Sequence, residues 1–123
     1  MKKDELPKIM NDLVNKKCEP CEGGVLPFDI SEIHKFQKKV DGWDVKKNEK
    51  QKYFLEKNFR FKNFKKSKNF IDMVGQIAEN ENHHPEITFG WGYAKIEITT
   101  HAIEGLSIND FILAAKIDQI ANA

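Results

Sequence analysis

Hydrophobic and polar residues follow one another along the chain with two periods, one typical of helices and one typical of strands. The helical period occurs in three segments, which predict helices over residues 30–40, 64–82 and 108–115. Two-residue alternation and short apolar runs beside turns predict four strands, near residues 43–45, 53–61, 86–91 and 93–100. The predicted order is therefore helix, two strands, helix, two strands, helix.

Polar residues at the helix starts support these boundaries. Asp29 and Glu32 have the D-x-x-E spacing of a capping box, and Asn63 and Ser107 stand at the N-cap positions of the second and third helices. Strands paired by short turns, with a helix between the pairs, predict an α+β fold. We expect a four-stranded antiparallel sheet with three helices packed on one face, in the order α-β-β-α-β-β-α.

The length and composition are those of a single domain. The chain of 123 residues is 40% hydrophobic and includes nine Phe, which excludes a wholly disordered protein. Residues 27–123 are expected to form the domain, and residues 1–26 an N-terminal arm with the Pro and Gly content of a loop. The longest apolar run, residues 111–115, is far shorter than the roughly 20 residues that span a bilayer. Because the chain also turns acidic where a signal peptide would turn apolar, we expect a cytoplasmic protein with no membrane contact.

The charge is distributed unevenly, although the formal net charge is only +1. Residues 35–68 hold thirteen Lys and Arg against four Asp and Glu, whereas residues 69–123 hold two Lys against eight acids. Such asymmetry occurs in nucleic-acid-binding proteins. However, bidentate base contacts favour Arg, and Arg60 is the only arginine in the sequence. A solvated lysine-rich face is therefore the favoured interpretation, and nucleic acid is not expected as a partner.

Three of the four histidines lie at the ends of predicted elements. His83 and His84 follow the long helix, before Pro85 directs the chain away from helical backbone, and His101 follows the fourth strand. An imidazole titrates near about pH 6.5, so this cluster can give and take protons at neutral pH. Two other interpretations stay open: favourable charge placement at a helix C-terminus, and a zinc site, although side chains of adjacent residues diverge.

Two carboxylates and a cysteine pair complete the candidate chemistry. Glu79 lies one helical turn before His83, near enough to orient its imidazole if the helix continues. Asp110 lies in the first turn of the last helix, where carboxylates are favoured. Cys18 and Cys21 form a C-x-x-C in the arm without a preceding strand or a second ligand pair. We therefore expect a reduced, structurally neutral pair rather than a zinc or redox site.

The same residues form a pattern that resembles the pterin-4a-carbinolamine dehydratase family. The matching segments are E-x-x-x-H-H-P-E at residues 79–86, T-H at 100–101, G-L-S at 105–107 and Asp110, with G-W at 42–43 and F-R-F-K-N-F at 59–64 upstream. The resemblance covers about residues 27–121. The family's fold, with helices on one face of a four-stranded antiparallel sheet, agrees with the predicted order of elements.

The resemblance implies a hydro-lyase that removes water from 4a-hydroxytetrahydropterin, the product of an aromatic amino acid hydroxylase, and so recycles the pterin as quinonoid dihydropterin. It implies no metal or organic cofactor, and a homodimer or homotetramer that is functionally linked to such a hydroxylase. His83, His84 and His101 match the family's catalytic residues. Family residues that surround the substrate match Glu79, Pro85, Thr100 and Asp110, the last of them at the edge of the pocket. We expect the paired histidines to transfer protons and His101 to protonate or position the departing hydroxyl. The sequence does not decide which is acid and which is base.

The chain also departs from the family's usual pattern. Trp, Asn, an acidic residue and Arg are common in the family where this chain has Ile87, Phe89, Ala102 and Asn109. These positions bear on substrate preference and the pocket rim rather than on proton transfer. Because the family includes members that have lost activity, a non-catalytic binding or assembly module of the same fold is the alternative. The complete set of polar residues favours the enzyme.

Overall fold

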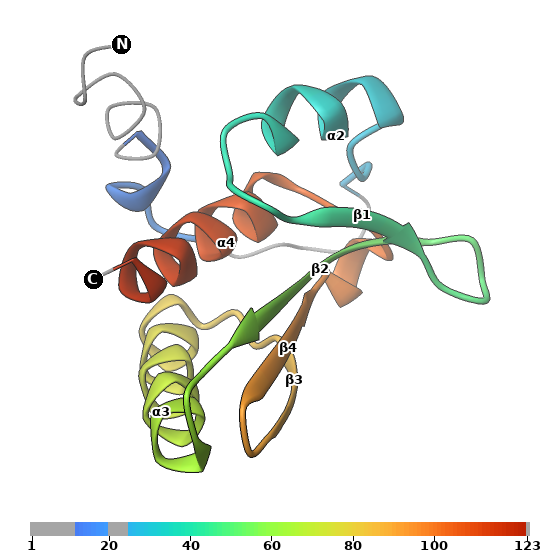
Figure 1. Ribbon diagram of the computed structural model, residues 1–123. Coiled ribbons are helices and arrows are strands. Elements are labelled where there is room, and N and C mark those ends of the chain that lie inside the picture. Colours follow the sequence, from blue (N-terminus) through green and yellow to red (C-terminus); the bar gives the residue numbers. More distant parts are fainter. Residues whose placement is uncertain (1–11, 20–24, 123) are drawn as a thin grey trace, which may run out of the picture.

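The structure, a computed structural model, describes residues 12–19 and 25–122. Its elements are α2 (Ile30–Gln37), β1 (Asp44–Lys47), β2 (Tyr53–Arg60), α3 (Phe64–Glu81), β3 (Glu86–Gly90), β4 (Tyr93–Ile98), a 3₁₀ turn η1 (His101–Ile103) and α4 (Ile108–Ala121). The predicted order of helices and strands and the α+β fold class are both confirmed (Figure 1).

The four strands form one antiparallel sheet in the order β1-β2-β4-β3. Leu55 of β2 lies opposite Ile98 of β4, and Ile87 of β3 lies opposite Ile96 of β4. These side chains belong to the hydrophobic core, because they point to the face of the sheet that the three helices cover. Among the described elements, no helix covers the other face.

The caps predicted from the sequence set the helix boundaries. Asp29 accepts a hydrogen bond from the Glu32 backbone N–H at 2.8 Å, and the Glu32 carboxylate accepts one from the Asp29 N–H at 3.1 Å. The predicted N-cap residues of α3 and α4 also accept backbone hydrogen bonds. Helix α2 ends at Gln37, earlier than predicted, because residues 38–40 continue in tighter turns.

Helix α4 is buried on nearly all sides. Residues 109–115, Ile117 and Asp118 are all buried. The prediction of a single apolar stripe was wrong in extent, because α4 packs against α2, α3 and β4 together. Leu13, from the short N-terminal segment, is 1% exposed and joins the same core.

A charged pair lies within this core. Lys57 occupies the helix-facing side of β2 opposite Ile96, and its ammonium lies 2.7 Å from a carboxylate oxygen of the fully buried Asp118. Asp118 also accepts hydrogen bonds from the Trp43 indole N–H at 3.0 Å and the Asp41 backbone N–H at 3.1 Å. Burial raises the pKa of the Asp118 carboxyl, although Lys57 opposes that rise. These bonds fasten the segment before β1 to α4.

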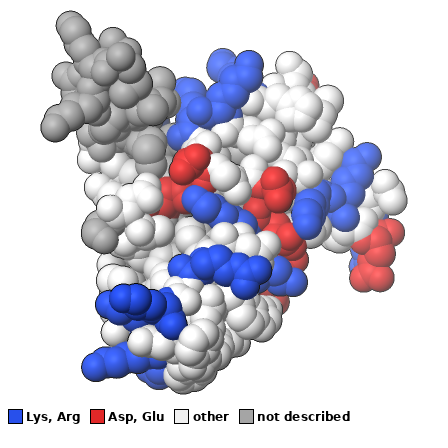
Figure 2. Space-filling view, in the orientation of Figure 1, with Lys and Arg blue, Asp and Glu red and all other residues white. Residues whose placement is uncertain are grey.

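The surface carries its charges in small groups. Figure 2 shows Lys and Arg side chains in several separate clusters on one face, with acidic side chains between some of them. On that face the described residues therefore form no continuous basic surface. Within the described ranges, no helix is both long enough and apolar enough to cross a membrane.

Candidate active site

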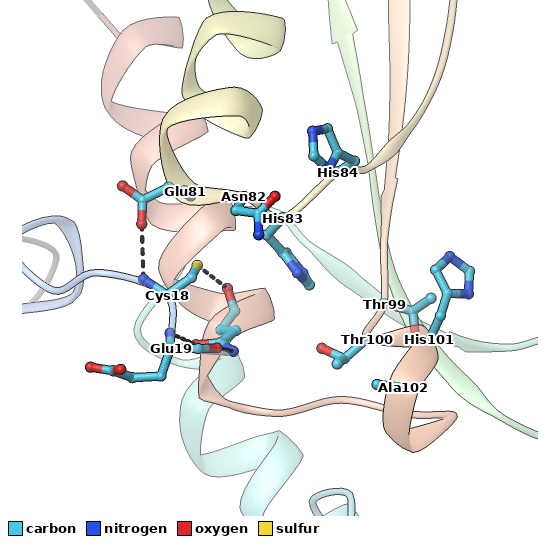
Figure 3. A pocket seen from close by; sticks show the side chains of 11 residues that line it. Cys18, Glu19, Glu81, Asn82, His83, His84, Thr99, Thr100, His101 and Ala102 are labelled. Atoms are coloured by element: carbon cyan, nitrogen blue, oxygen red, sulfur yellow. Dashed lines mark hydrogen bonds between the residues drawn. The ribbon is translucent and has the colours of Figure 1, made fainter. Parts of the chain in front are cut away.

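A cavity of about 400 Å³ lies where the end of α3, the end of β4 and the start of α4 meet (Figure 3). Residues from these three places and from the N-terminal arm line it: Cys18, Glu19, Glu81, Asn82, His83, His84, Thr99, Thr100, His101, Ala102 and Asn109. Four of the residues predicted for the site, the three histidines and Thr100, therefore line one cavity. Glu79, Pro85 and Asp110 are not part of this lining.

The end of α3 gives the paired histidines different surroundings. Asn82 adopts the left-handed conformation (φ 51°, ψ 41°) and ends the helix. The His83 backbone N–H then donates to the Ala78 carbonyl at 3.1 Å, and Pro85 keeps the following chain extended. As a result the His83 side chain is only 12% exposed, whereas that of His84 is 55% exposed.

His83 is held by a buried carboxylate. Its Nε2 lies 2.9 Å from one oxygen of Asp110, whose side chain is completely buried. The other oxygen of Asp110 accepts hydrogen bonds from the Thr100 hydroxyl at 2.7 Å and the Ser107 backbone N–H at 2.8 Å. An ionised Asp110 acts as an acceptor only, so Nε2 of His83 carries a proton and its Nδ1 is the nitrogen left for a substrate.

The structure corrects two expectations about the carboxylates. Glu79 pairs with Nε2 of His84 rather than with His83, because the left-handed Asn82 ends the helix before the predicted i, i+4 contact can form. Asp110 lies beneath the cavity rather than at its edge, because it is the third residue of α4 and its side chain turns back to the N-cap Ser107. Glu79 remains at the surface, with 72% of its side chain exposed.

His101 stands across the cavity from the arm. It is the first residue of η1, directly after Thr100, and its side chain is exposed. In Figure 3 its imidazole and that of His83 come from different elements and lie on different parts of the cavity. With Thr99 and His84 it also lines an adjacent cavity of about 280 Å³, which extends over the uncovered face of the sheet.

The cavity includes residues that were not predicted to take part in the site. Glu81, at the end of α3, accepts a hydrogen bond from the Cys18 backbone N–H at 2.9 Å and pairs with Lys116 at 2.6 Å. Burial opposes ionisation of Glu81, but the bonds from Lys116 and the Cys18 N–H together keep its pKa below the ordinary value. Asn109 binds the backbone of Glu19. These partners are far apart in sequence, so no local pattern indicated them.

Of the two cysteines in the C-x-x-C, the structure describes only Cys18. Burial, followed by the nearby Glu81 carboxylate, raises the pKa of the Cys18 thiol to about 12. Cys21 lies outside the described residues, so the expectation of a reduced pair stays a prediction. Among the described His, Cys, Asp and Glu residues, no group of three or more is arranged to hold a metal ion.

Known proteins resemble this chain over most of its length. A family model described as Pterin 4 alpha carbinolamine dehydratase matches residues 27–120. A protein of Rubrobacter xylanophilus, provisionally named pterin-4-alpha-carbinolamine dehydratase, is 42% identical over 111 residues, which cover 90% of this chain and 100% of that protein. A protein of Methylococcus capsulatus with the same provisional name is 43% identical over 109 residues, covering 89% and 93%.

Solved structures share the fold as well. A transcriptional coactivator/pterin dehydratase from Brucella melitensis superposes with a TM-score of 0.70 at 26% identity, covering 77% of this chain and 98% of that one. A pterin dehydratase-like protein, identified as a RuBisCO assembly factor in the alpha-carboxysome, gives a TM-score of 0.57 at 23% identity, covering 67% and 92%, and shows likeness of fold alone. With a family model over most of its length and relatives of such identity, this chain belongs to the pterin 4 alpha carbinolamine dehydratase family.

Proposed function

We propose that this chain is a dehydratase that converts 4a-hydroxytetrahydropterin to quinonoid dihydropterin. The observation that carries the proposal is the pair of His83 and the buried Asp110 at a cavity that also holds His84 and His101. A buried carboxylate behind an imidazole fixes its tautomer and stabilises its protonated form, as general acid–base chemistry requires. Membership of the family supports the pterin substrate.

The reaction needs two proton transfers. The C4a–O bond breaks, the departing hydroxyl takes up a proton to become water, N5 loses its proton, and a C4a=N5 double bond forms. An acid and a base on different sides of that bond are sufficient. Imidazoles from the end of α3 and from η1 supply two such groups at one cavity.

The surroundings of each histidine support a division of roles. His83 takes the N5 proton at Nδ1, because its Nε2 is already engaged by Asp110. His101, to whose imidazole no described residue forms a hydrogen bond, protonates the departing hydroxyl. His84, paired with Glu79 at the exposed rim, orients the substrate and exchanges protons with solvent.

The proposal is tested by following the 4a-carbinolamine released by a purified phenylalanine hydroxylase, with and without this protein. We expect the protein to accelerate carbinolamine loss and His83→Ala to lower that acceleration by about a hundredfold or more, the range of general acid–base catalysis. His34→Ala is the matched control, because His34 is an exposed histidine on α2 outside the cavity. Full activity in His83→Ala would contradict the role of His83 as the base. A folded wild-type protein without activity would favour the non-catalytic module instead.

The proposal also includes the reaction that supplies the substrate. We infer that the product is recycled after aromatic amino acid hydroxylation, since that reaction class supplies the carbinolamine. The expected homodimer or homotetramer, the link to a hydroxylase and the cytoplasmic location stay predictions.

A further inference from the structure

We propose that residues Cys18 and Glu19 of the N-terminal arm form a wall of the substrate site, and that Glu81 and Asn109 are positioning residues that hold this wall in place. The inference rests on the dehydratase function proposed above. It adds a part of the chain that the family match leaves out, because the family model begins at residue 27. Both arm residues line the 400 Å³ cavity together with the histidines.

Asn109 holds the arm through three of its polar groups. Its side-chain oxygen accepts a hydrogen bond from the Glu19 N–H at 3.0 Å, and its side-chain NH₂ donates to the Glu19 carbonyl at 2.6 Å. Its backbone carbonyl accepts a bond from the Cys18 thiol at 3.5 Å. Asn109 is only 4% exposed, so its side of these bonds is shielded from competing water. The amide thus pairs with the arm backbone much as a neighbouring strand would.

Glu81 fastens the same segment from the other helix. One carboxylate oxygen accepts the Cys18 N–H at 2.9 Å, and the other accepts the Lys116 ammonium at 2.6 Å. The Glu81 side chain is 5% exposed and that of Lys116 is 16% exposed. Since Glu81 is the last residue of α3, the helix end that presents His83 also fixes the arm.

The position of the arm explains what it does for a substrate. Figure 3 shows Cys18 and Glu19 on one side of the cavity and Thr100 and His101 on the other, with His83 between them. Because the same cavity is lined by the arm and by both His83 and His101, a ligand that fills it contacts the arm as well as these histidines. The arm carries none of the proposed proton donors or acceptors, so releasing it weakens substrate binding more than it slows the chemical step.

Steady-state kinetics of Asn109→Ala test the inference. We expect KM for the carbinolamine to rise about tenfold or more, because both side-chain hydrogen bonds to Glu19 are lost, while kcat stays within about twofold. Asn58→Ala is the matched control, because it makes the same chemical change at an exposed position of β2 that does not line the cavity. Glu81→Gln, which keeps an oxygen for the Cys18 N–H but removes the charge opposite Lys116, is expected to give a smaller rise in KM. A fall in kcat with KM unchanged in Asn109→Ala would overturn the inference.

The rate at which Cys18 is alkylated tests the inference without an activity assay. In a Cys21→Ser background, iodoacetamide should modify Cys18 slowly, because the thiol is half-buried and its pKa is raised to about 12. Asn109→Ala should speed modification about tenfold, and a saturating stable pterin, 7,8-dihydrobiopterin, should slow it where Asn109 is kept. Protection by the pterin in a protein that does not dehydrate the carbinolamine would support the wall and refute the enzyme. Active enzyme with no pterin protection and no effect of Asn109→Ala would support the enzyme and refute the wall.

Discussion

Replacing Lys57 by Met isolates a buried carboxylate and gives the sharpest test of the fold's electrostatics. Lys57 supplies the only described positive charge that contacts Asp118, at 2.7 Å, and Asp118 is completely buried. Met keeps most of the apolar stem of Lys57 but removes its charge. Asp118 then retains the Trp43 and Asp41 N–H donors and nothing to balance its charge. Breaking one side of a buried ion pair usually costs about 3–5 kcal/mol.

The structure also sets a ceiling on that loss, because Asp118 can bind a proton instead of staying charged. Holding a carboxyl protonated costs about 1.36 kcal/mol for each pH unit above its ordinary pKa, which is 3.8 for this group. The ceiling is therefore about 5 kcal/mol at pH 7.5 and about 2 kcal/mol at pH 5.5. The sign follows from the raised pKa: the folded state binds the proton more tightly than the unfolded state, so the stability contributed by Asp118 falls as the pH rises above 3.8.

Urea denaturation at a fixed protein concentration measures both effects. We expect Lys57→Met to lose about 3 kcal/mol at pH 7.5 and clearly less at pH 5.5. Adding Asp118→Asn to Lys57→Met removes the unbalanced charge, so the double variant should be more stable than Lys57→Met alone at pH 7.5. If the losses of the two single variants simply add, or if the loss in Lys57→Met does not depend on pH, the reasoning is refuted.

Two further changes give simpler readouts. Asp110→Asn replaces one carboxylate oxygen by an NH₂ group, which loses an acceptor either for His83 or for Thr100 and the Ser107 N–H. We expect kcat to fall about a hundredfold while the protein still folds, as measured by carbinolamine loss and circular dichroism. Glu97 lies directly opposite Glu56 on one side and Glu86 on the other. Glu97→Gln should therefore raise the free energy of unfolding by about 0.5 kcal/mol at low salt, and a gain that does not shrink at about 0.5 M NaCl would contradict this explanation.

The elements were predictable from the sequence because their signals are local. The Asp29–Glu32 capping box, the Asn63 and Ser107 caps and the stop at Asn82 each act within a few residues, and all were found where the sequence placed them. The sequence placed three histidines at the ends of elements, the family resemblance gave them a shared site, and in the structure all three line one cavity.

The partners of the site residues were not predictable in the same way. Cys18 and Glu81 are 63 residues apart, and Glu19 and Asn109 are 90 apart, so nothing in the neighbouring sequence could indicate either contact. Glu79 was assigned to the wrong histidine because the i, i+4 rule assumes a continuous helix, and one left-handed residue ends it. The buried pair of Lys57 and Asp118 was not predicted, although a charged residue at a core-facing position of a strand indicates a buried partner.

The site and the stability of the fold depend on the same hydrogen bonds at the ends of the elements. Asp110 completes the capping box of α4 and also engages His83, while Glu81 ends α3 and also fixes the arm. A cap fixes the backbone direction at the residue where an element ends, so a side chain placed directly after it is held in position without being buried in the core. Asn82 fixes the backbone that leads to His83 and His84, and Thr100, whose N–H donates to the Gly105 carbonyl and whose hydroxyl donates to Asp110, fixes the backbone before His101, so both exposed imidazoles start from fixed positions. It also means that variants of Asp110 lose stability and activity together, whereas variants of His83 remove the chemistry and leave the cap intact.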